Sequence, residues 1–230
     1  MKGVILQPTY LPWLGYFEMI SKVDIFIIYD HVQFVKKSWH HRNRIKGPNG
    51  EILLSLPIKK APLDTPLCET LLTDDYQKAL NNHWASISHS YKKSKFFHKY
   101  SSGLEDLYSS KYISLTDLTI NFIQYFCDQL SIKTEIYASS KFAIDSSIIN
   151  PNEKVIDLCR KANITSLYDA NGAQEILDVD FFNKNNIKLL FQNYSHPVYS
   201  QVFGNFIPYL SVIDLLLNEG PNSLKIIRKG

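Results

Sequence analysis

Two short apolar runs near the start of the chain, residues 4–6 and 25–29, limit most strongly what this sequence can fold into. Runs without polar alternation are typical of strands that are covered on both faces of a parallel sheet. Between the two runs, Pro8 and Pro12 disfavour helix until about Trp13, and the apolar positions that follow recur at helical spacing. The chain is therefore expected to begin with a βαβ unit.

The rest of the chain extends this unit. Further strands are predicted at residues 51–58, 134–139, 165–168 and 187–191. Asn150 followed by Pro151 predicts a helix start, Phe181 and Phe182 a short helix, and residues 211–218 a final helix that Gly220-Pro221 ends. Strands that alternate with helices predict a Rossmann-like α/β fold with a mostly parallel sheet.

Between about residues 75 and 130 the apolar pattern becomes helical, with three successive stripes at 3.6-residue spacing. No flexible linker flanks this part. We therefore expect one α/β domain over residues 1–230, with a three-helix insert within it.

Charge and cysteine content exclude several classes of protein. The net charge of +3 is too small to predict binding to duplex nucleic acid or to a membrane surface. Cys68, Cys127 and Cys159 are odd in number and widely spaced, which fits a reducing cytoplasm. No apolar stretch is long enough to span a bilayer. We expect a cytoplasmic protein, and the sequence leaves its oligomeric state open.

The most unusual local feature is a basic segment that follows the second strand and contains Lys36, Lys37, His40, His41, Arg42, Arg44 and Lys46. Residues 36–49 are predicted to form a loop, closed by a turn at residues 47–50. A cationic run is commonly a solvated face. Here Trp39 and Asn43 interrupt it, and arginines at this place could grip a phosphate or carboxylate in a two-pronged fashion. A phosphorylated small molecule or the phosphopantetheine end of an acyl carrier fits this segment.

Polar residues also follow the predicted strands. Gln7 and Asp30 should meet at the carboxyl edge of the sheet, where open α/β folds bind ligands. Asp30 and His196 are the candidate acid–base groups, although each could serve only as a loop anchor. Asn171-Gly172 could cradle an anion or form a plain turn. His31, His40 and His41 match no zinc spacing, so no metal is expected.

Five blocks of this sequence resemble the WbqC-like family. They are ILQPTYLPWLGYF at 5–17, DIFIIYDHVQF at 24–34, SWHHRNRIK at 38–46, YSHPVY at 194–199 and PYLSVIDLLLNEGP at 208–221. The family often reads His-Gln-Pro-Asn-Tyr in the first block, where this chain has Leu6 and Thr9 in place of the His and the Asn. The layout of the first strands also resembles nucleotidyltransferases with an HxGH loop, but Trp13-Leu14-Gly15-Tyr16 stands where that loop would be.

The WbqC-like resemblance implies a role in bacterial surface polysaccharide assembly, such as O-antigen, by transfer of glycine or another acyl group to an amino sugar. It implies motif positions at Asp30, Gln33, Trp39, Arg42, Asn43, Arg44, His196 and Tyr199. With the catalytic candidates Asp30 and His196, we take as substrate-binding candidates Gln7, Tyr10, Gln33, Trp39, Arg42, Asn43, Arg44, Lys46, Asn171, Gly172 and Tyr199.

Three hypotheses follow. The first is an acyl or aminoacyl transferase acting on a nucleotide-linked amino sugar, with an acyl carrier protein, a CoA thioester or an aminoacyl-tRNA as donor. The second is an ATP-dependent carboxylate-activating enzyme on the same fold. The third is a non-catalytic adaptor that binds an acyl carrier protein or another partner through the basic segment.

Overall fold

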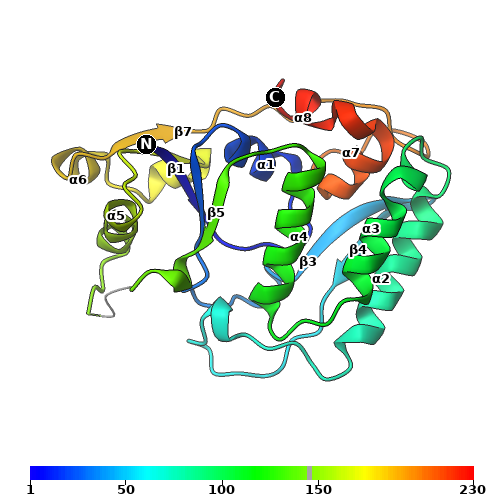
Figure 1. Ribbon diagram of the computed structural model, residues 1–230, viewed down its shortest axis with the longest axis horizontal. Coiled ribbons are helices and arrows are strands. Elements are labelled where there is room, and N and C mark those ends of the chain that lie inside the picture. The colour runs from blue at the N-terminus through cyan, green and yellow to red at the C-terminus, as the bar shows by residue number, and fades with distance from the viewer. Residues whose placement is uncertain (144–146) are drawn as a thin grey trace.

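A five-stranded parallel sheet forms the centre of the computed structural model, which describes residues 1–143 and 147–230 (Figure 1). Its strands are β1 (Lys2–Leu6), β2 (Ile25–Ile28), β5 (Glu135–Ala138), β6 (Ser166–Asp169) and β7 (Lys188–Phe191), in the order β5-β2-β1-β6-β7. All four neighbouring pairs are parallel. The predicted Rossmann-like α/β fold is confirmed.

The direction in which strands are added reverses at β1. The chain places β2 and then β5 on one side of β1, and afterwards returns to place β6 and β7 on the other side. In open α/β sheets, the carboxyl ends of the two strands at such a reversal leave a crevice in which ligands bind. Here the reversal lies between β1 and β6.

Helices cover both faces of this sheet. α1 (Leu14–Ser21), α4 (Leu115–Gln129), α7 (Val212–Glu219) and α8 (Ser223–Ile227) pack in one core with Val4 and Phe26. α5 (Pro151–Lys161) and α6 (Val179–Lys184) pack on the opposite face in a second core with Ile5 and Ile27 (Figure 1). The alternation of neighbouring residues between the two cores is the period of two that a strand imposes.

The basic segment contains a strand that was not predicted. β3 (Arg42–Gly47) and β4 (Gly50–Ser55) form an antiparallel hairpin separate from the main sheet, so the prediction of a loop over residues 36–49 is wrong for residues 42–47. The cations there alternate with Asn43 and Ile45, which are buried, and this alternation is a strand pattern. The predicted turn at residues 47–50 is confirmed, with Gly50 at φ +117°.

The three predicted helices between β4 and β5 are confirmed as α2 (Tyr76–Tyr91), α3 (Phe97–Ser109) and α4. Ser114 caps α4, because its hydroxyl oxygen accepts a hydrogen bond from the backbone N–H of Asp117 at 3.1 Å. These helices share one hydrophobic core with α1 and one face of the sheet.

Short 3₁₀ turns connect several elements, namely η1 (Leu67–Glu69), η2 (Ser139–Lys141), η3 (Asn171–Glu175) and η4 (Gly220–Asn222). Gly220-Pro221 ends α7 as predicted, but the chain resumes as α8, which the sequence did not indicate. Within residues 1–143 and 147–230, no helix has both the length and the apolar character needed to cross a bilayer.

Candidate functional site

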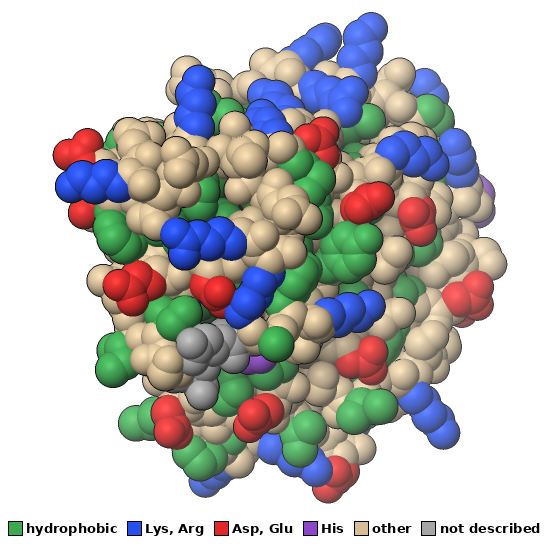
Figure 2. All heavy atoms as spheres, turned by 60° about the vertical axis from the view of Figure 1, so that its left-hand side comes forward, with side chains coloured by type: hydrophobic (Ala, Val, Ile, Leu, Met, Phe, Trp, Pro, Cys, Tyr) green, Lys and Arg blue, Asp and Glu red, His purple; other side chains and the backbone are tan. Residues whose placement is uncertain are grey.

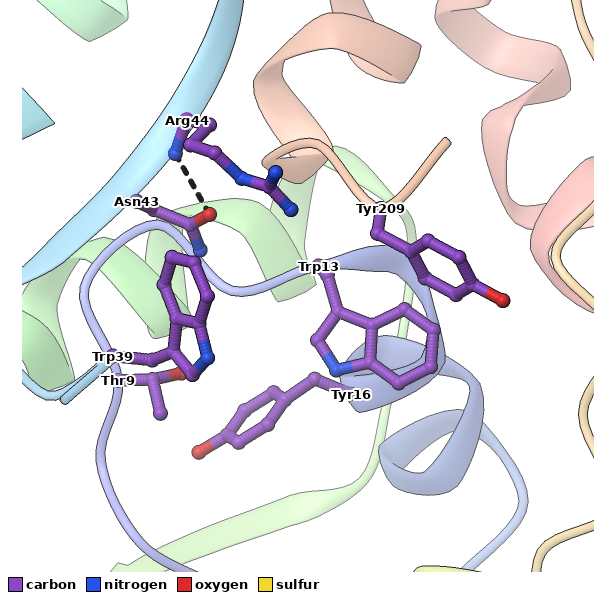
Figure 3. Close-up of a pocket in the computed structure, with 7 residues that line it drawn as sticks. All are labelled: Thr9, Trp13, Tyr16, Trp39, Asn43, Arg44 and Tyr209. Carbon is purple, nitrogen blue, oxygen red and sulfur yellow. Dashed lines mark hydrogen bonds between the residues drawn. The ribbon is translucent and has the colours of Figure 1, made fainter. Parts of the chain in front are cut away.

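A cavity of about 250 Å³ lies beside the loop that follows β1, on the side of the sheet that carries α1 (Figure 3). It is lined by Thr9, Trp13, Tyr16, Trp39, Asn43, Arg44 and Tyr209, and we call it the aromatic cavity. Three segments that are distant in sequence build it: the β1–α1 connection with the start of α1, β3 with the residues before it, and the loop before α7.

Aromatic rings form the walls of this cavity. Figure 3 shows Trp39 and Trp13 on opposite sides of an open space, with Tyr16 below and the guanidinium of Arg44 extending toward it from above. The Trp13 ring is held from behind by Tyr194 and Tyr209, each with its ring centroid 5.6 Å from that of Trp13. Trp39 is 48% exposed, so its ring is available to a ligand that enters from solvent.

The Arg44 side chain is fixed without using all of its donors. Its Nη1 donates to both carboxylate oxygens of Glu51 across the hairpin, at 3.0 and 2.8 Å. Its Cζ lies 5.4 Å from the centroid of the Trp39 ring, a cation–π distance. Nε of Arg44 is buried, and neither Nε nor Nη2 has a hydrogen-bond partner among the described residues. The guanidinium is thus pre-oriented and retains donors for an anionic group.

Arg42 lies on the same side of Trp39. Its Cζ is 5.8 Å from the ring centroid, and its Nη2 donates to the backbone carbonyl of Lys37. The two arginines are two residues apart on β3 and therefore project to the same face of the hairpin. A second cation is therefore available beside the mouth of the cavity.

Asn43 supports the cavity from inside. Its Nδ2 donates to the carbonyls of Tyr10 and Leu11, at 3.2 and 2.7 Å, and its Oδ1 accepts from the backbone N–H of Arg44 at 2.8 Å. Leu11 has φ 51° and Tyr209 has φ 58°, left-handed backbone values that residues other than glycine rarely adopt. Leu11 lies two residues before Trp13, and Tyr209 is the ring that packs against Trp13. Strained backbone therefore positions this wall of the cavity.

Gln7 joins the end of β1 to the basic segment. Its Oε1 accepts a hydrogen bond from Nε2 of His40 at 2.7 Å, and its backbone carbonyl accepts from the hydroxyl of Tyr16 at 3.2 Å. Burial, together with the neighbouring His41, lowers the pKa of His40 to about 4. His40 is therefore neutral at pH 7, with its proton on the nitrogen that faces Gln7.

Asp30 is buried at the end of β2, with 1% of its surface exposed. Its carboxylate accepts hydrogen bonds from the Ser139 hydroxyl at 2.6 Å, from the Ser140 backbone N–H at 3.0 Å and from the Ser140 hydroxyl at 2.8 Å. The backbone N–H of Asp30 donates in turn to the Ser139 oxygen at 3.1 Å. Asp30 thus ties the end of β2 to the end of β5 and does not line the aromatic cavity.

His196 lies directly behind the Trp13 wall. Its ring is stacked on Trp13 at 6.4 Å and 15°, and it meets Tyr209 edge-on at 4.9 Å. Nδ1 donates to the carbonyl of Pro197 at 2.9 Å, which leaves Nε2 as a buried acceptor without a partner among the described residues. Burial lowers the pKa of His196, so the neutral ring is favoured.

Three further candidates are packed in the interior. The Tyr10 hydroxyl lies 2.9 Å from Nδ1 of His83 and 3.1 Å from the Tyr108 hydroxyl, inside the helical layer. Lys46 is 2% exposed and donates from Nζ to the Asn205 carbonyl at 2.6 Å. The Tyr199 hydroxyl donates to Asp214 at 2.7 Å.

Asp214 on α7 is a fully buried carboxylate that the sequence did not single out as a site residue. It accepts from the hydroxyls of Tyr91 and Tyr199, at 2.8 and 2.7 Å, and from Nε2 of Gln201 at 2.8 Å. Gln201 also accepts from Nζ of Lys46. The network connects α2, β3, the loop before α7 and α7, and so fixes the hairpin beneath the aromatic cavity.

The remaining candidates lie outside this cavity. Asn171 and Gly172 are exposed in η3, and Oδ1 of Asn171 accepts from Gln174 at 2.6 Å. Gln33 is exposed, and its Nε2 donates to the Leu63 carbonyl. The structure thus gathers Trp39, Asn43 and Arg44 at one cavity, places Gln7, Arg42 and His196 next to it, and separates the others.

Four cavity residues were missed as site candidates: Thr9, Trp13, Tyr16 and Tyr209. All four fall within the sequence blocks that carry the family resemblance, and three are aromatic. Two features of the sequence could have indicated them: its richness in tyrosine, and the Trp within a Pro-containing connection. In the described part of the chain, no cluster of three or more His, Cys, Asp or Glu side chains is arranged to hold a metal ion.

Comparisons with known proteins agree with these blocks. The chain is 30% identical over 235 residues to "Uncharacterized protein Rv1507c" of Mycobacterium tuberculosis, and the alignment covers 99% of both chains. No solved structure matches the chain. The model of the WbqC-like protein family matches residues 7–226, and on this match the chain belongs to the WbqC-like protein family.

Proposed function

We propose that this protein is an acyl or aminoacyl transferase that acts on a nucleotide-linked amino sugar in surface polysaccharide biosynthesis. The observation that carries the proposal is the aromatic cavity, in which two facing tryptophans stand beside a pre-oriented arginine. The three free, widely separated cysteines of the chain fit an enzyme of the reducing cytoplasm.

The cavity suits the parts of a nucleotide sugar. Trp13 and Trp39 offer flat faces on which a pyrimidine base or the apolar face of a sugar ring can stack. Arg44 and Arg42 can each donate to oxygens of the diphosphate. Glu51 keeps Arg44 in place by accepting hydrogen bonds from Nη1 alone, so it does not occupy the other donors of the guanidinium. Thr9 and Asn43 add small polar groups to the lining.

In the transfer step, the amine nitrogen of the sugar attacks the carbonyl carbon of the donor. A new amide bond forms, and the bond from that carbon to the sulfur or oxygen of the donor breaks. The proton lost from the amine ends on the leaving sulfur or oxygen. His196 is our candidate for carrying that proton, because its Nε2 is an unprotonated acceptor without a partner in the described chain.

The position of His196 sets a condition on this role. Trp13 and Tyr209 lie between its ring and the cavity, so one of them must shift when the substrate binds to open Nε2 to the amine. Both carboxylate oxygens of Asp30 are occupied by hydrogen bonds from the η2 turn. We therefore give Asp30 a positioning role.

Binding and transfer can be tested separately. Calorimetric titration with UDP- and dTDP-linked amino sugars should show binding that Arg44→Gln weakens and that Arg160→Gln, on the exposed face of α5, leaves unchanged. Incubation of the same sugars with an acyl carrier thioester, a CoA thioester or an aminoacyl-tRNA should yield a sugar heavier by one acyl group in mass spectrometry. Absence of both binding and product with every combination would reject the proposal.

A second function is favoured by one observation, the reversal of strand order between β1 and β6. Nucleotides often bind at this place in open α/β sheets, so ATP-dependent activation of a carboxylate is the competing assignment. Pyrophosphate exchange into ATP in the presence of candidate carboxylic acids distinguishes the two, because the transferase requires no ATP.

A further inference from the structure

A second cavity, of about 230 Å³, lies at the carboxyl edge of the sheet. Its apolar walls include Ile5, Tyr29, Val155 and Leu177, which belong to the core under α5 and α6, and its polar lining is Gln7 and Asp169. The aromatic cavity is instead built on α1, whose residues belong to the other core. The two cavities therefore lie on opposite faces of the same sheet. We call the second one the Asp169 cavity.

The Asp169 cavity occupies the point where the strand order reverses. Ile5 and Leu6 end β1, Asp169 ends β6, and these two strands are neighbours at the reversal. Helices on the two sides of the sheet diverge there, which leaves a crevice that side chains do not fill. The fold thus produces this cavity independently of the loops that build the aromatic one.

Asp169 is the charged group of this cavity, and the protein offers its half-buried carboxylate few partners. Oδ1 accepts a hydrogen bond from the backbone N–H of Ala170 at 2.7 Å. Within the described residues, no other donor reaches either oxygen and no cation pairs with it. Burial raises the pKa of Asp169 to about 6, so the group is still mainly ionised at pH 7.

An ionised carboxylate among apolar walls selects the charge of its ligand. A neutral hydroxyl compound would leave the negative charge uncompensated, and a phosphate would be repelled. A primary ammonium group both neutralises the charge and donates hydrogen bonds to the free oxygen. The outer surface does not make this selection, because Figure 2 shows acidic and basic side chains interspersed on the side of the molecule that carries α5 and α6.

We propose that the Asp169 cavity binds the α-ammonium group of an aminoacyl donor, with the body of the amino acid against the apolar walls. A carboxylate stabilises the protonated form of an amine that it contacts, and a protonated amine cannot attack a carbonyl. The partner of Asp169 is therefore the amine that must stay unreactive. That describes the amino group of an aminoacyl donor and not the acceptor amine of the sugar.

Gln7 places the two cavities next to each other. Gln7 is one of the residues that line the Asp169 cavity, and its backbone carbonyl accepts from the hydroxyl of Tyr16, which lines the aromatic cavity. A donor held at Asp169 would thus present its carbonyl near the end of β1, beside the sugar nucleotide. The role assigned to the bound amine rests on the proposed transferase function, whereas the binding of an ammonium group does not.

Four small compounds test this inference on the complete chain: alaninamide, N-acetylalaninamide, glucosamine and N-acetylglucosamine. In ¹H–¹⁵N NMR titrations, alaninamide should shift the amide signals of Gln7, Tyr29 and Ala173. The affinity of the N-acetyl form should be lower by a factor of about ten or more, as expected for loss of one charge-assisted hydrogen bond. The indole signals of Trp13 and Trp39 should stay in place, because they report the aromatic cavity.

Two variants complete the test. Asp169→Asn keeps the size of the side chain and should reduce alaninamide binding to the level of its N-acetyl form. Ala173→Met narrows the cavity without touching the carboxylate and should weaken both compounds together. Unchanged alaninamide binding in Asp169→Asn, or no shift of the cavity amides in the wild type, would overturn the site. Tighter binding of glucosamine than of alaninamide at these amides would overturn its assignment to the donor.

The outcome is distinguishable from that of the proposed function. Titration with a UDP-amino sugar moves the Trp39 indole signal if the aromatic cavity binds nucleotide sugars. That result does not depend on Asp169.

Discussion

Oε1 of Gln7 lies 2.7 Å from Nε2 of His40, and this hydrogen bond fastens the end of β1 to the segment that carries Trp39. His40 is 5% exposed, and its other ring nitrogen has no partner in the described chain. The geometry at the carboxyl edge of the sheet therefore depends on a contact between two polar side chains that do not touch the aromatic cavity.

Replacing Gln7 with Leu should destabilise the protein by about 1–3 kcal/mol, because the buried N–H of His40 loses its acceptor. Gln7→Glu retains an oxygen at the same place and should lose less. Urea denaturation measures both. Equal stability of Gln7→Leu and the wild type would show that the hydrogen bond contributes nothing.

Trp39→Ala should lower the affinity for a UDP-linked sugar by about 1–3 kcal/mol, the range found for stacking of a base on an aromatic side chain. Trp39→Phe should retain most of the affinity. Because Trp39 is 48% exposed, neither change should affect the melting temperature strongly. Tyr137→Ala removes another exposed aromatic ring, from β5, and serves as the calorimetric control.

Asn43→Asp preserves shape but replaces the amide that donates to the carbonyls of Tyr10 and Leu11. Two donors are lost and a carboxylate then faces two carbonyl oxygens, so we expect a loss of about 2–4 kcal/mol. Asn82→Asp, the same change at an exposed position of α2, should cost far less. Similar denaturation midpoints for the two variants would contradict a supporting role for Asn43.

Asp30→Asn should destabilise the protein by about 2–4 kcal/mol, because a buried carboxylate that accepts three hydrogen bonds becomes a half-mismatched amide. Transfer activity per folded molecule should stay within about twofold of the wild-type value, since a residue that only positions the backbone affects the stability of the fold and not the chemical step. A large fall in kcat with unchanged stability would instead make Asp30 a catalytic residue. Asp64→Asn, at an exposed acid, is the control.

His83 gives the clearest pH dependence. Burial lowers its pKa to about 4, below the value of about 6.5 for an unfolded histidine, so the unfolded chain takes up a proton first as pH falls. The stability that this group contributes is complete above pH 6.5 and is lost as the pH falls toward 4. Removing it as His83→Gln should reduce the loss of unfolding free energy between pH 7 and pH 5 by about 2 kcal/mol.

Other groups titrate in the same window, so the comparison must be between variants. His40 acts in the same direction as His83, while Asp169, whose pKa is raised to about 6, acts in the opposite one. The difference between wild type and His83→Gln at each pH isolates His83. His98→Gln, the same change at an exposed histidine of α3, is the matched control variant. A His83→Gln protein with the wild-type pH dependence would contradict burial as the cause.

Uninterrupted apolar runs predicted β1 and β2, because a strand covered on both faces carries no polar alternation. β5 and β7 are partly exposed strands at the two edges of the sheet, and they were predicted as short strand segments that alternate with helices. β3 was missed because its outward positions are Arg42 and Arg44, and its inward ones include Asn43, so its alternation is not one of apolar against polar. Its pairing with β4 and the contacts of Asn43 stabilise it, and neither is visible in local sequence.

The site was harder to predict because polarity at a strand end does not reveal what the side chain meets. Asp30 and Tyr10 were reasonable ligand-binding candidates, yet both find their partners inside the protein, more than seventy positions along the chain. Trp39, Asn43 and Arg44 were predicted as candidates because an aromatic ring and an amide interrupt the basic segment, and all three line one cavity. Trp13 and Tyr209 meet because the segment before α7 pairs with the loop that follows β1, through the bridge between Trp13 and Ser211.

The carboxylate of Asp214 has a consequence for any attempt to dissect this protein. It is held by hydroxyl groups from both the central and the late parts of the chain, and one hydrogen bond further it reaches the hairpin that carries Arg44. A truncated chain that ended before residue 210 would lose the anchor of that hairpin along with α7 and α8. The N-terminal half that carries most of the family blocks should therefore be unable to form the aromatic cavity on its own.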